Sequence, residues 1–154
     1  MIPYGKHDLT EKDINRVLKV LKSDFLTQGP EVEKFEKNIS LYCKNKYSVA
    51  VNSATSALHI SCLALGLGKG DYLWTSAISF VASSNCALYC GAKVDFVDID
   101  PDTYNLCPKK LEEKLKVAKK EHKLPKILVP VHLSGQPADL QKIKNLSNKY
   151  NFKI

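Results

Sequence analysis

From Tyr47 onward, short apolar segments alternate with longer segments of helical periodicity along this 154-residue chain. β-branched and aromatic residues concentrate in the short segments, and apolar residues recur every third or fourth position in the longer ones. Strands without polar alternation are typical of sheets buried on both faces, and strand–helix–strand connections make consecutive strands parallel. The pattern therefore predicts an α/β fold of three layers, a mainly parallel sheet with helices on both faces.

The expected elements follow from where each periodicity starts and stops. The expected strands are 47–51, 72–76, 93–98 and 126–132, and the expected helices that follow them are 55–66, 79–90, 108–121 and 137–150. Phe152–Ile154 reads as the start of another strand, so the sheet looks incomplete at its C-terminal end.

Two amphipathic helices are expected before the sheet, at 10–22 and 31–42, and Gly29-Pro30 ends the loop between them. The first helix is expected to bury an apolar stripe of Ile14, Val17, Leu18 and Leu21, and the second carries Val32, Phe35 and Ile39 on one face. The chain thus divides into N-terminal helices with their loop, 1–45, and a sheet-containing part, 46–154.

Charge and cysteine content narrow the class of protein. The net charge is +7, but Arg16 is the only arginine, and the lysines of 109–120 alternate with glutamates around a helical apolar stripe. A solvated helix face explains this pattern better than nucleic-acid binding, which usually adds arginines and exposed aromatic residues. The five cysteines form no CxxC pair, and Cys62 and Cys86 fall in apolar helical patterns, as buried reduced thiols do. With no signal peptide and no apolar run of about 18 residues, a cytoplasmic protein is expected.

In a parallel sheet, ligands bind at the carboxyl ends of the strands. The segment Asn52–His59 follows one such end and opens a helix, so three hydroxyls and unpaired backbone N–H groups crowd a first helical turn. This arrangement suits a phosphate, but serine and threonine are also ordinary helix caps, and the pattern alone leaves both readings open.

Other residues at the expected strand ends have equally ordinary readings. His132 ends a strand, Asp98 and Asp100 enter a turn where aspartate often bonds nearby backbone, and Phe80 suits either a core or a planar ligand. The four histidines have no ligand-like spacing, so no metal site is expected. The glycines of 66–70 follow a helix and do not form a phosphate-binding loop.

Six motifs, in this order along the chain, resemble those of the sugar-nucleotide aminotransferases. They are Leu26-Thr27-Gln28-Gly29-Pro30, Asn52-Ser53-Ala54-Thr55-Ser56-Ala57-Leu58-His59, Gly68-Lys69-Gly70-Asp71, Ile78-Ser79-Phe80-Val81-Ala82, Val97-Asp98-Ile99-Asp100 and Val129-Pro130-Val131-His132. The resemblance implies a pyridoxal-phosphate enzyme of the aspartate-aminotransferase fold. The first and fourth motifs look most like the pseudaminic-acid branch, whose members move an amino group from glutamate to C4 of a UDP-linked 4-keto-6-deoxy-N-acetylhexosamine.

The resemblance also implies roles for individual residues. The cofactor phosphate would bind at Ala54, Thr55 and Ser56, and Phe80 would stack on the pyridine ring. His132 falls in a motif near the cofactor, without an assigned step. The sugar nucleotide would meet six residues, namely Tyr4, Asp24, Phe25, Leu26, Thr27 and Ala54. The complete form is expected to be a homodimer.

Departures from the family pattern limit what the 154 residues are expected to do. Trp74, Ser76 and Ala77 replace the usual threonines and proline, and Cys107 replaces an aspartate. The pyridinium-binding aspartate, the Schiff-base lysine and the small domain would all lie beyond Ile154. No catalytic residue is therefore expected in this chain, and these 154 residues alone are expected not to transaminate.

Three alternatives remain beside this reading. The chain could be a non-catalytic fragment that binds pyridoxal phosphate or a nucleotide sugar and contributes a dimer surface. It could belong to an aminotransferase acting on another keto-sugar nucleotide. A basic nucleic-acid binder is supported by charge alone.

Overall fold

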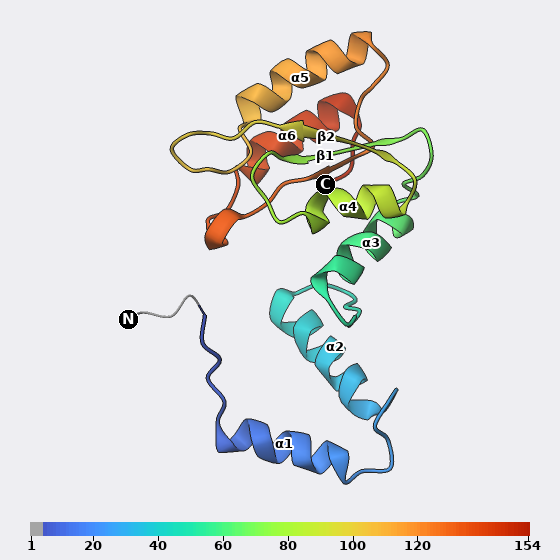
Figure 1. The fold of residues 1–154 in the computed structure, drawn as a ribbon, viewed down its shortest axis with the longest axis vertical. Coiled ribbons are helices and arrows are strands. Elements are labelled where there is room, and N and C mark those ends of the chain that lie inside the picture. Colours follow the sequence, from blue (N-terminus) through green and yellow to red (C-terminus); the bar gives the residue numbers. More distant parts are fainter. Residues whose placement is uncertain (1–4) are drawn as a thin grey trace. The chain divides into compact units, whose positions relative to one another are not determined.

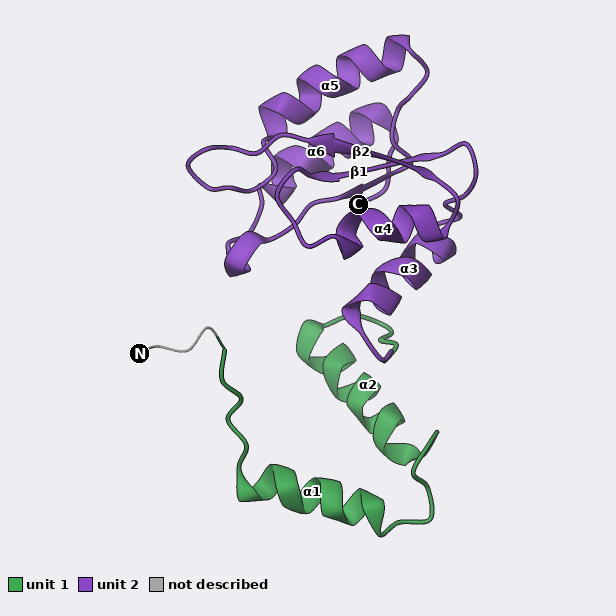
Figure 2. Ribbon diagram, viewed as in Figure 1, with its two compact units in different colours: residues 1–50 green, residues 51–154 purple. Residues whose placement is uncertain are grey.

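The computed structural model describes residues 5–154, which form two compact units, and the boundary between them in the sequence follows Ala50 (Figure 2). The first unit holds two helices, and the second, Val51–Ile154, holds the sheet. The functional division at 45/46 expected from the sequence stays a prediction.

The first unit contains α1 (Glu11–Leu21) and α2 (Pro30–Cys43). A capping box starts α1: the Thr10 backbone N–H donates to Asp13 Oδ2 at 2.8 Å, and the Asp13 N–H donates to Thr10 Oγ1 at 3.4 Å. Hydrogen bonds from Thr10 hold the pKa of the Asp13 carboxyl below its ordinary value. Pro30 opens α2, where its missing N–H costs nothing.

The burial expected for the apolar stripe of α1 is wrong. Neither helix has a buried residue; Val17 of α1 is 59% exposed and Phe35 of α2 is 57% exposed. An amphipathic pattern shows which helix face prefers an apolar neighbour, and it does not show that the same chain segment supplies one.

The second unit is an α/β fold, as expected (Figure 1). Its sheet has the order β2-β1-β3, with β1 (Tyr72–Ser76) in the centre and parallel to both neighbours, β2 (Lys93–Val97) and β3 (Ile127–Val129). Thr75 lies opposite Phe96 on one side and Val129 on the other. Helices α3 (Ala54–Ala64) and α4 (Ala82–Tyr89) cover one face, and α5 (Pro108–Lys120) and α6 (Leu140–Tyr150) cover the opposite face. A short 3-10 helix, η1 (Leu133–Gly135), follows β3.

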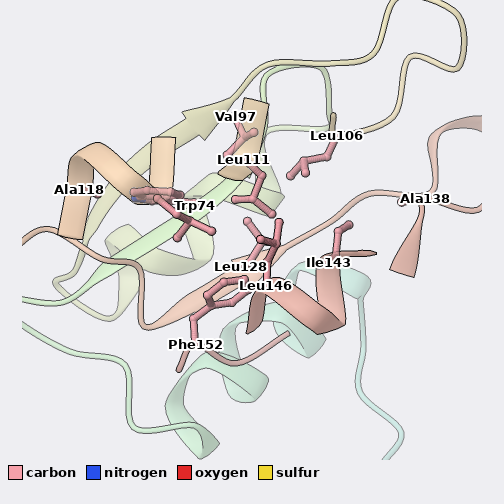
Figure 3. Close-up of a cluster of buried hydrophobic side chains, with 11 residues drawn as sticks. Trp74, Val97, Leu106, Leu111, Ala118, Leu128, Ala138, Ile143, Leu146 and Phe152 are labelled. Carbon is pink, nitrogen blue, oxygen red and sulfur yellow. The ribbon is translucent and has the colours of Figure 1, made fainter. Parts of the chain in front are cut away.

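Two apolar clusters fill the space on either side of β1. Trp74 and Leu128 belong to the cluster under α5 and α6 (Figure 3), whereas Leu73 and Ile127 belong to the cluster under α3 and α4. Because successive side chains of a strand point to opposite faces, β1 contributes to both cores. Lys114 of α5 lies over the Trp74 ring, with its Nζ 5.0 Å from the ring centroid.

The strand expected at 47–51 is wrong, because no strand forms there. A strand needs a neighbouring strand to pair with, and among the described residues this segment instead bonds to α2 side chains. The Ala50 N–H donates to Glu36 Oε1 at 2.8 Å, and the Ser48 hydroxyl accepts from the Ser40 hydroxyl at 2.9 Å. The polar groups of this segment are thus partly satisfied without a sheet.

Smaller differences lie at element ends. The strand expected at 126–132 ends at Val129, directly before Pro130, which has no N–H for a ladder. The helices expected from 79 and 137 begin at Ala82 and Leu140. The further strand expected at the chain end is present as a parallel bridge between Lys153 and Ile127. Within residues 5–154, no helix is long and apolar enough to cross a membrane.

A lysine ties β3 to the turn that leads into β1. Lys126 Nζ donates to the Gly66 carbonyl at 2.5 Å and to Asp71 Oδ2 at 2.8 Å. The bond from Lys126 is the main reason that the pKa of Asp71 lies below its ordinary value. Both side chains are partly exposed, so solvent screens the pair and keeps its contribution small.

We expect Lys126→Met to lower the free energy of unfolding by about 1 kcal/mol at pH 7, measured by urea denaturation. Because the pKa of Asp71 is lowered in the folded state, its contribution is complete above the unfolded pKa, near ~4, and is lost as pH falls through the folded value. The difference between variant and wild type should thus hold from about pH 7 to 5 and shrink below about pH 4. Lys69→Met, on the same turn but outside the ion pairs of residues 5–154, is the control. An equal loss in that control would contradict this account.

Candidate functional site

The carboxyl ends of β1, β2 and β3 open onto loops at one edge of the sheet (Figure 1). Ligands of open parallel sheets bind at this edge. Three loops leave these strand ends: 77–81, 98–107 and 130–139. The start of α3 belongs to the same compact unit as these loops.

In the first turn of α3, hydrogen bonds of the helix cap already occupy some of the donor groups. Ser53 is the N-cap, with extended backbone, and its Oγ accepts from the Ser56 N–H at 3.1 Å. The Ser56 hydroxyl donates to Asn52 Oδ1 at 2.7 Å. The capping reading of this motif therefore holds for Ser53, and Ser56 has both its N–H and its O–H engaged.

The remaining groups of this turn fit a phosphate. Within residues 5–154, the N–H groups of Ala54 and Thr55 donate no hydrogen bond, and the half-buried Thr55 hydroxyl has no partner. Unpaired N–H groups at a helix start carry the positive end of the helix dipole, which favours a dianion such as a phosphate ester. Two N–H donors and one hydroxyl thus form a donor set of the kind that binds a phosphate ester.

Phe80 presents its ring to solvent at the end of the loop that follows β1. Its side chain is 75% exposed, which excludes the core reading for this ring within the described chain. The adjacent Ser79 and Ser83 hydroxyls are 2.7 Å apart and fix the start of α4. A cavity of about 210 Å³ lies beside the ring and is lined in part by Ser76 and Phe96. An exposed ring in a rigid turn can stack on a planar heteroaromatic ligand.

The polar residues after β2 have local structural roles. Asp98 Oδ1 accepts from the Ile99 N–H at 2.9 Å, and Asp100 Oδ1 accepts from the N–H groups of Asp102 at 3.0 Å and Thr103 at 3.1 Å. These are the backbone bonds that aspartate commonly makes in turns. After β3, His132 Nδ1 accepts from the Ala138 N–H at 3.0 Å, which also gives that ring a structural role.

Asn105 is a residue of this edge that the sequence did not single out. It is buried, and its side-chain amide bonds to the loop after β3. A single asparagine before an apolar residue has no periodicity or spacing that would mark it, so only the fold shows which segments it joins.

The loop expected to contact substrate lies in the first unit. Phe25 and Leu26 line a groove of about 470 Å³ there, whereas Asp24 and Thr27 do not. A Cβ on Gly29 would lie 2.8 Å from Phe25 Cβ, so this loop conformation needs glycine. Tyr4 lies outside the described residues, and Ala54 belongs to the second unit. The roles of all these residues stay predictions.

Comparison with known proteins identifies the family. The sequence profile of the DegT/DnrJ/EryC1/StrS aminotransferase family matches residues 7–154, nearly the whole chain. The chain belongs to this family. Its resemblance to sugar aminotransferases and its α/β fold are thereby confirmed.

Two curated family relatives are similar over almost all of the chain. A Bacillus subtilis 3-oxo-glucose-6-phosphate:glutamate aminotransferase is 37% identical over 148 residues, which are 96% of this chain and 32% of that protein. A Campylobacter jejuni UDP-4-amino-4,6-dideoxy-N-acetyl-beta-L-altrosamine transaminase is 38% identical over 154 residues, which are 100% of this chain and 40% of that protein. The chain thus spans about a third to two fifths of these aminotransferases.

A solved family structure is similar in fold and carries the cofactor. The putative sugar aminotransferase Spr1654 from Streptococcus pneumoniae, in its PLP form, superposes with a TM-score of 0.87 at 31% identity. The match covers 99% of this chain and 38% of that one. The described fold is therefore that of one part of a pyridoxal-phosphate-dependent aminotransferase of this family.

The geometry separates a capping residue from a binding residue in the first turn of α3. Ser53→Ala removes the cap acceptor and should lower the free energy of unfolding by about 1 kcal/mol. Thr55→Val keeps the side-chain shape and removes a hydroxyl without a partner in the described chain, so it should change stability by less than about 0.5 kcal/mol. Urea denaturation of both variants measures the difference. A Thr55 variant as destabilised as the Ser53 variant would show that the Thr55 hydroxyl has a structural bond.

Proposed function

We propose that this chain is the N-terminal part of a pyridoxal-phosphate-dependent sugar-nucleotide aminotransferase. It would move an amino group from glutamate to C4 of a UDP-linked 4-keto-6-deoxy-N-acetylhexosamine, in pseudaminic acid or related surface-glycan biosynthesis. The observation that carries the cofactor part is the unused donor set at Ala54 and Thr55, together with the exposed ring of Phe80 in the same unit. The substrate part is supported by the name of the Campylobacter jejuni relative.

The donor set defines what this chain would contribute to cofactor binding. Bound pyridoxal phosphate supplies an electron sink for a carbanion at the substrate carbon. The N–H groups of Ala54 and Thr55 and the Thr55 hydroxyl would hold its phosphate. Ser56 would strengthen this site only by exchanging its bond to Asn52 for one to the phosphate. Phe80 would stack on the pyridine ring and fix its orientation.

The substrate side of the proposal concerns the loop of the first unit. Asp24, Phe25, Leu26 and Thr27, with Tyr4 and Ala54, would contact the sugar nucleotide. The Phe25 side chain is 60% exposed and Leu26 is 66% exposed, so both are available for a ligand in the described chain. We further propose a cytoplasmic homodimer as the complete form, with no nucleic acid or membrane partner.

The catalytic groups would come from outside these 154 residues. Transamination needs a lysine amine to move protons and a carboxylate near the pyridine nitrogen. Lys126, which directly precedes β3, pairs with Asp71 beside the amino end of β1, at the opposite end of that strand from Phe80. We therefore expect the isolated 154-residue chain to bind the cofactor without catalysing transfer.

Exposed apolar side chains favour a second candidate function, that of an assembly or binding fragment. Leu63 of α3 and Leu88 of α4 are 53% and 57% exposed. Apolar surface of this kind is typical of protein contacts. This candidate would bind ligand or a second copy without ever supporting transfer in the complete protein.

Cofactor binding by this chain is tested with pyridoxamine phosphate, whose amine cannot form adducts with surface lysines. Isothermal titration should show binding to wild type, and affinity should fall about tenfold in Phe80→Ala and in Thr55→Val, since each loses about 1–1.5 kcal/mol of contact. Tyr42→Ala is the matched control, because Tyr42 is another highly exposed aromatic residue but lies in the first unit, and this variant should bind as wild type does. Equal weakening in all three variants, or none in any, would contradict the assigned site.

Substrate choice is tested on the complete enzyme. With glutamate as donor, we expect the enzyme to aminate the UDP-linked 4-keto-6-deoxy-N-acetylhexosamine, and mass spectrometry of the product measures this reaction. The kcat/KM for 3-oxo-glucose-6-phosphate, which lacks the nucleotide, should be at least about a hundredfold lower than the kcat/KM for the UDP-linked sugar. The reverse preference would support the activity named for the Bacillus subtilis relative. No transfer to either, with retained ligand binding, would favour the binding-fragment candidate.

A further inference from the structure

Asn105 joins two loops at the carboxyl edge of the sheet through one buried side chain. Its Oδ1 accepts from the Leu133 N–H at 3.0 Å, and its Nδ2 donates to the Gln136 carbonyl at 2.9 Å. The residue is only 3% exposed. Asn105 follows β2 and Leu133 follows β3, and β1 separates these two strands in the sheet. The amide therefore links the loops of strands that do not pair with each other.

Asn105 is itself held by the loop from which it projects. Its carbonyl accepts from the Asp100 N–H at 2.8 Å, and its N–H donates to Thr103 Oγ1 at 3.4 Å. The next residue, Leu106, is buried and pairs with Ile99 in an antiparallel bridge. The side-chain amide thus has a fixed base from which to hold the second loop.

The turn that Asn105 holds has a strained backbone. Ser134 has φ 52° and Gly135 has φ 83°, two successive left-handed residues between the two bonded positions. A left-handed residue other than glycine costs roughly 1–2 kcal/mol. Such residues persist where the surroundings fix them, and they cluster at binding sites. Asn105 bonds both ends of this turn, at Leu133 and at Gln136.

The turn lies next to the strand that leads to the proposed cofactor site. It follows β3, which pairs with β1, and Thr75 Oγ1 of β1 donates to the Val129 carbonyl of β3 at 2.9 Å. β1 in turn leads to Phe80. The edge position of the turn is therefore fixed from two sides, by β1 through the strand and by Asn105 through the loop.

We propose that Asn105 is a positioning residue that holds the turn Leu133–Gln136 in the conformation the ligand-binding edge requires. The inference rests on the proposed function for the identity of the ligand, a phosphorylated pyridine cofactor. Asn105 touches no ligand in this proposal; it acts through the backbone of the turn. Replacing it with alanine removes the side-chain partner of the Leu133 N–H and of the Gln136 carbonyl. The left-handed turn is then held only by its own backbone bonds, from the Gly135 N–H to the His132 carbonyl at 3.1 Å and from the Gln136 N–H to the Leu133 carbonyl at 2.9 Å.

Two variants test the proposal against a matched control. Asn105→Ala removes both bonds, and Asn105→Asp keeps the side-chain shape but places an oxygen against the Gln136 carbonyl, so it leaves no cavity. The control is Ser147→Ala, which removes a buried hydroxyl that donates to the Phe152 carbonyl at 2.6 Å, beside the amino end of β3. Hydrogen exchange of 130–138 and titration with pyridoxamine phosphate are measured on each 154-residue chain.

We expect both Asn105 variants to exchange about tenfold faster over 132–138 and to bind pyridoxamine phosphate at least about fivefold more weakly. Ser147→Ala should change neither by more than about twofold, although it also loses stability. A residue with a merely structural role would lower stability and leave ligand affinity unchanged, as in the control. If Asn105→Ala does not fold, Asn105→Asp supports the same two measurements.

Failure of the inference and failure of the proposed function give different results. Unchanged exchange in the Asn105 variants, or faster exchange with wild-type ligand affinity, overturns the inference while the function stands. A wild-type chain that does not bind pyridoxamine phosphate contradicts the proposed function. In that case, hydrogen exchange by itself decides whether Asn105 positions the turn. A loss of protection confined to the Asn105 variants supports this role, and equal exchange in all variants overturns it.

Discussion

The parallel pairing of β1 with both neighbours is the constraint on which the second unit depends. Leu73, Trp74, Thr75 and Ser76 are all at most 2% exposed, so β1 is buried on both faces and at both edges. A strand in this position needs apolar helices on each side and a neighbour for every backbone group. Its burial fixes where its carboxyl end emerges, and the loops of the candidate site begin at that point.

The sequence predicted the elements that are defined by their own side chains and missed the features that need a partner. The strand 72–76 was predicted with its observed limits, because its apolar run and the glycines before it are local signals. The segment 47–51 is also a short, largely apolar run but forms no strand, because pairing is a property of two segments. The burial predicted for Ile14 and Leu21 was wrong for the same reason, since an apolar pattern does not show which segment will cover it.

The same distinction applies within the candidate site. The sequence predicted a helix start at 55, one residue from the observed start at Ala54, because capping and dipole are local to one turn. The bond from Ser56 to Asn52 was not predictable, since the sequence does not show which of the three hydroxyls near this turn makes it. The link from Asn105 to Leu133 spans 28 positions and depends on the strand order, so only the fold reveals it.

Strain explains why this edge needs support from several sides. The left-handed turn at Ser134 is unfavourable in an isolated chain, and Pro130 cannot donate to the sheet ladder beside it. The strand therefore ends early, and side-chain bonds from Asn105 and His132 hold the loop that follows. The turn also closes with its own backbone bonds, from the Gly135 N–H to the His132 carbonyl at 3.1 Å and from the Gln136 N–H to the Leu133 carbonyl at 2.9 Å. The first turn of α3 differs, because Ser53 caps it while the N–H groups of Ala54 and Thr55 stay unused within the described chain.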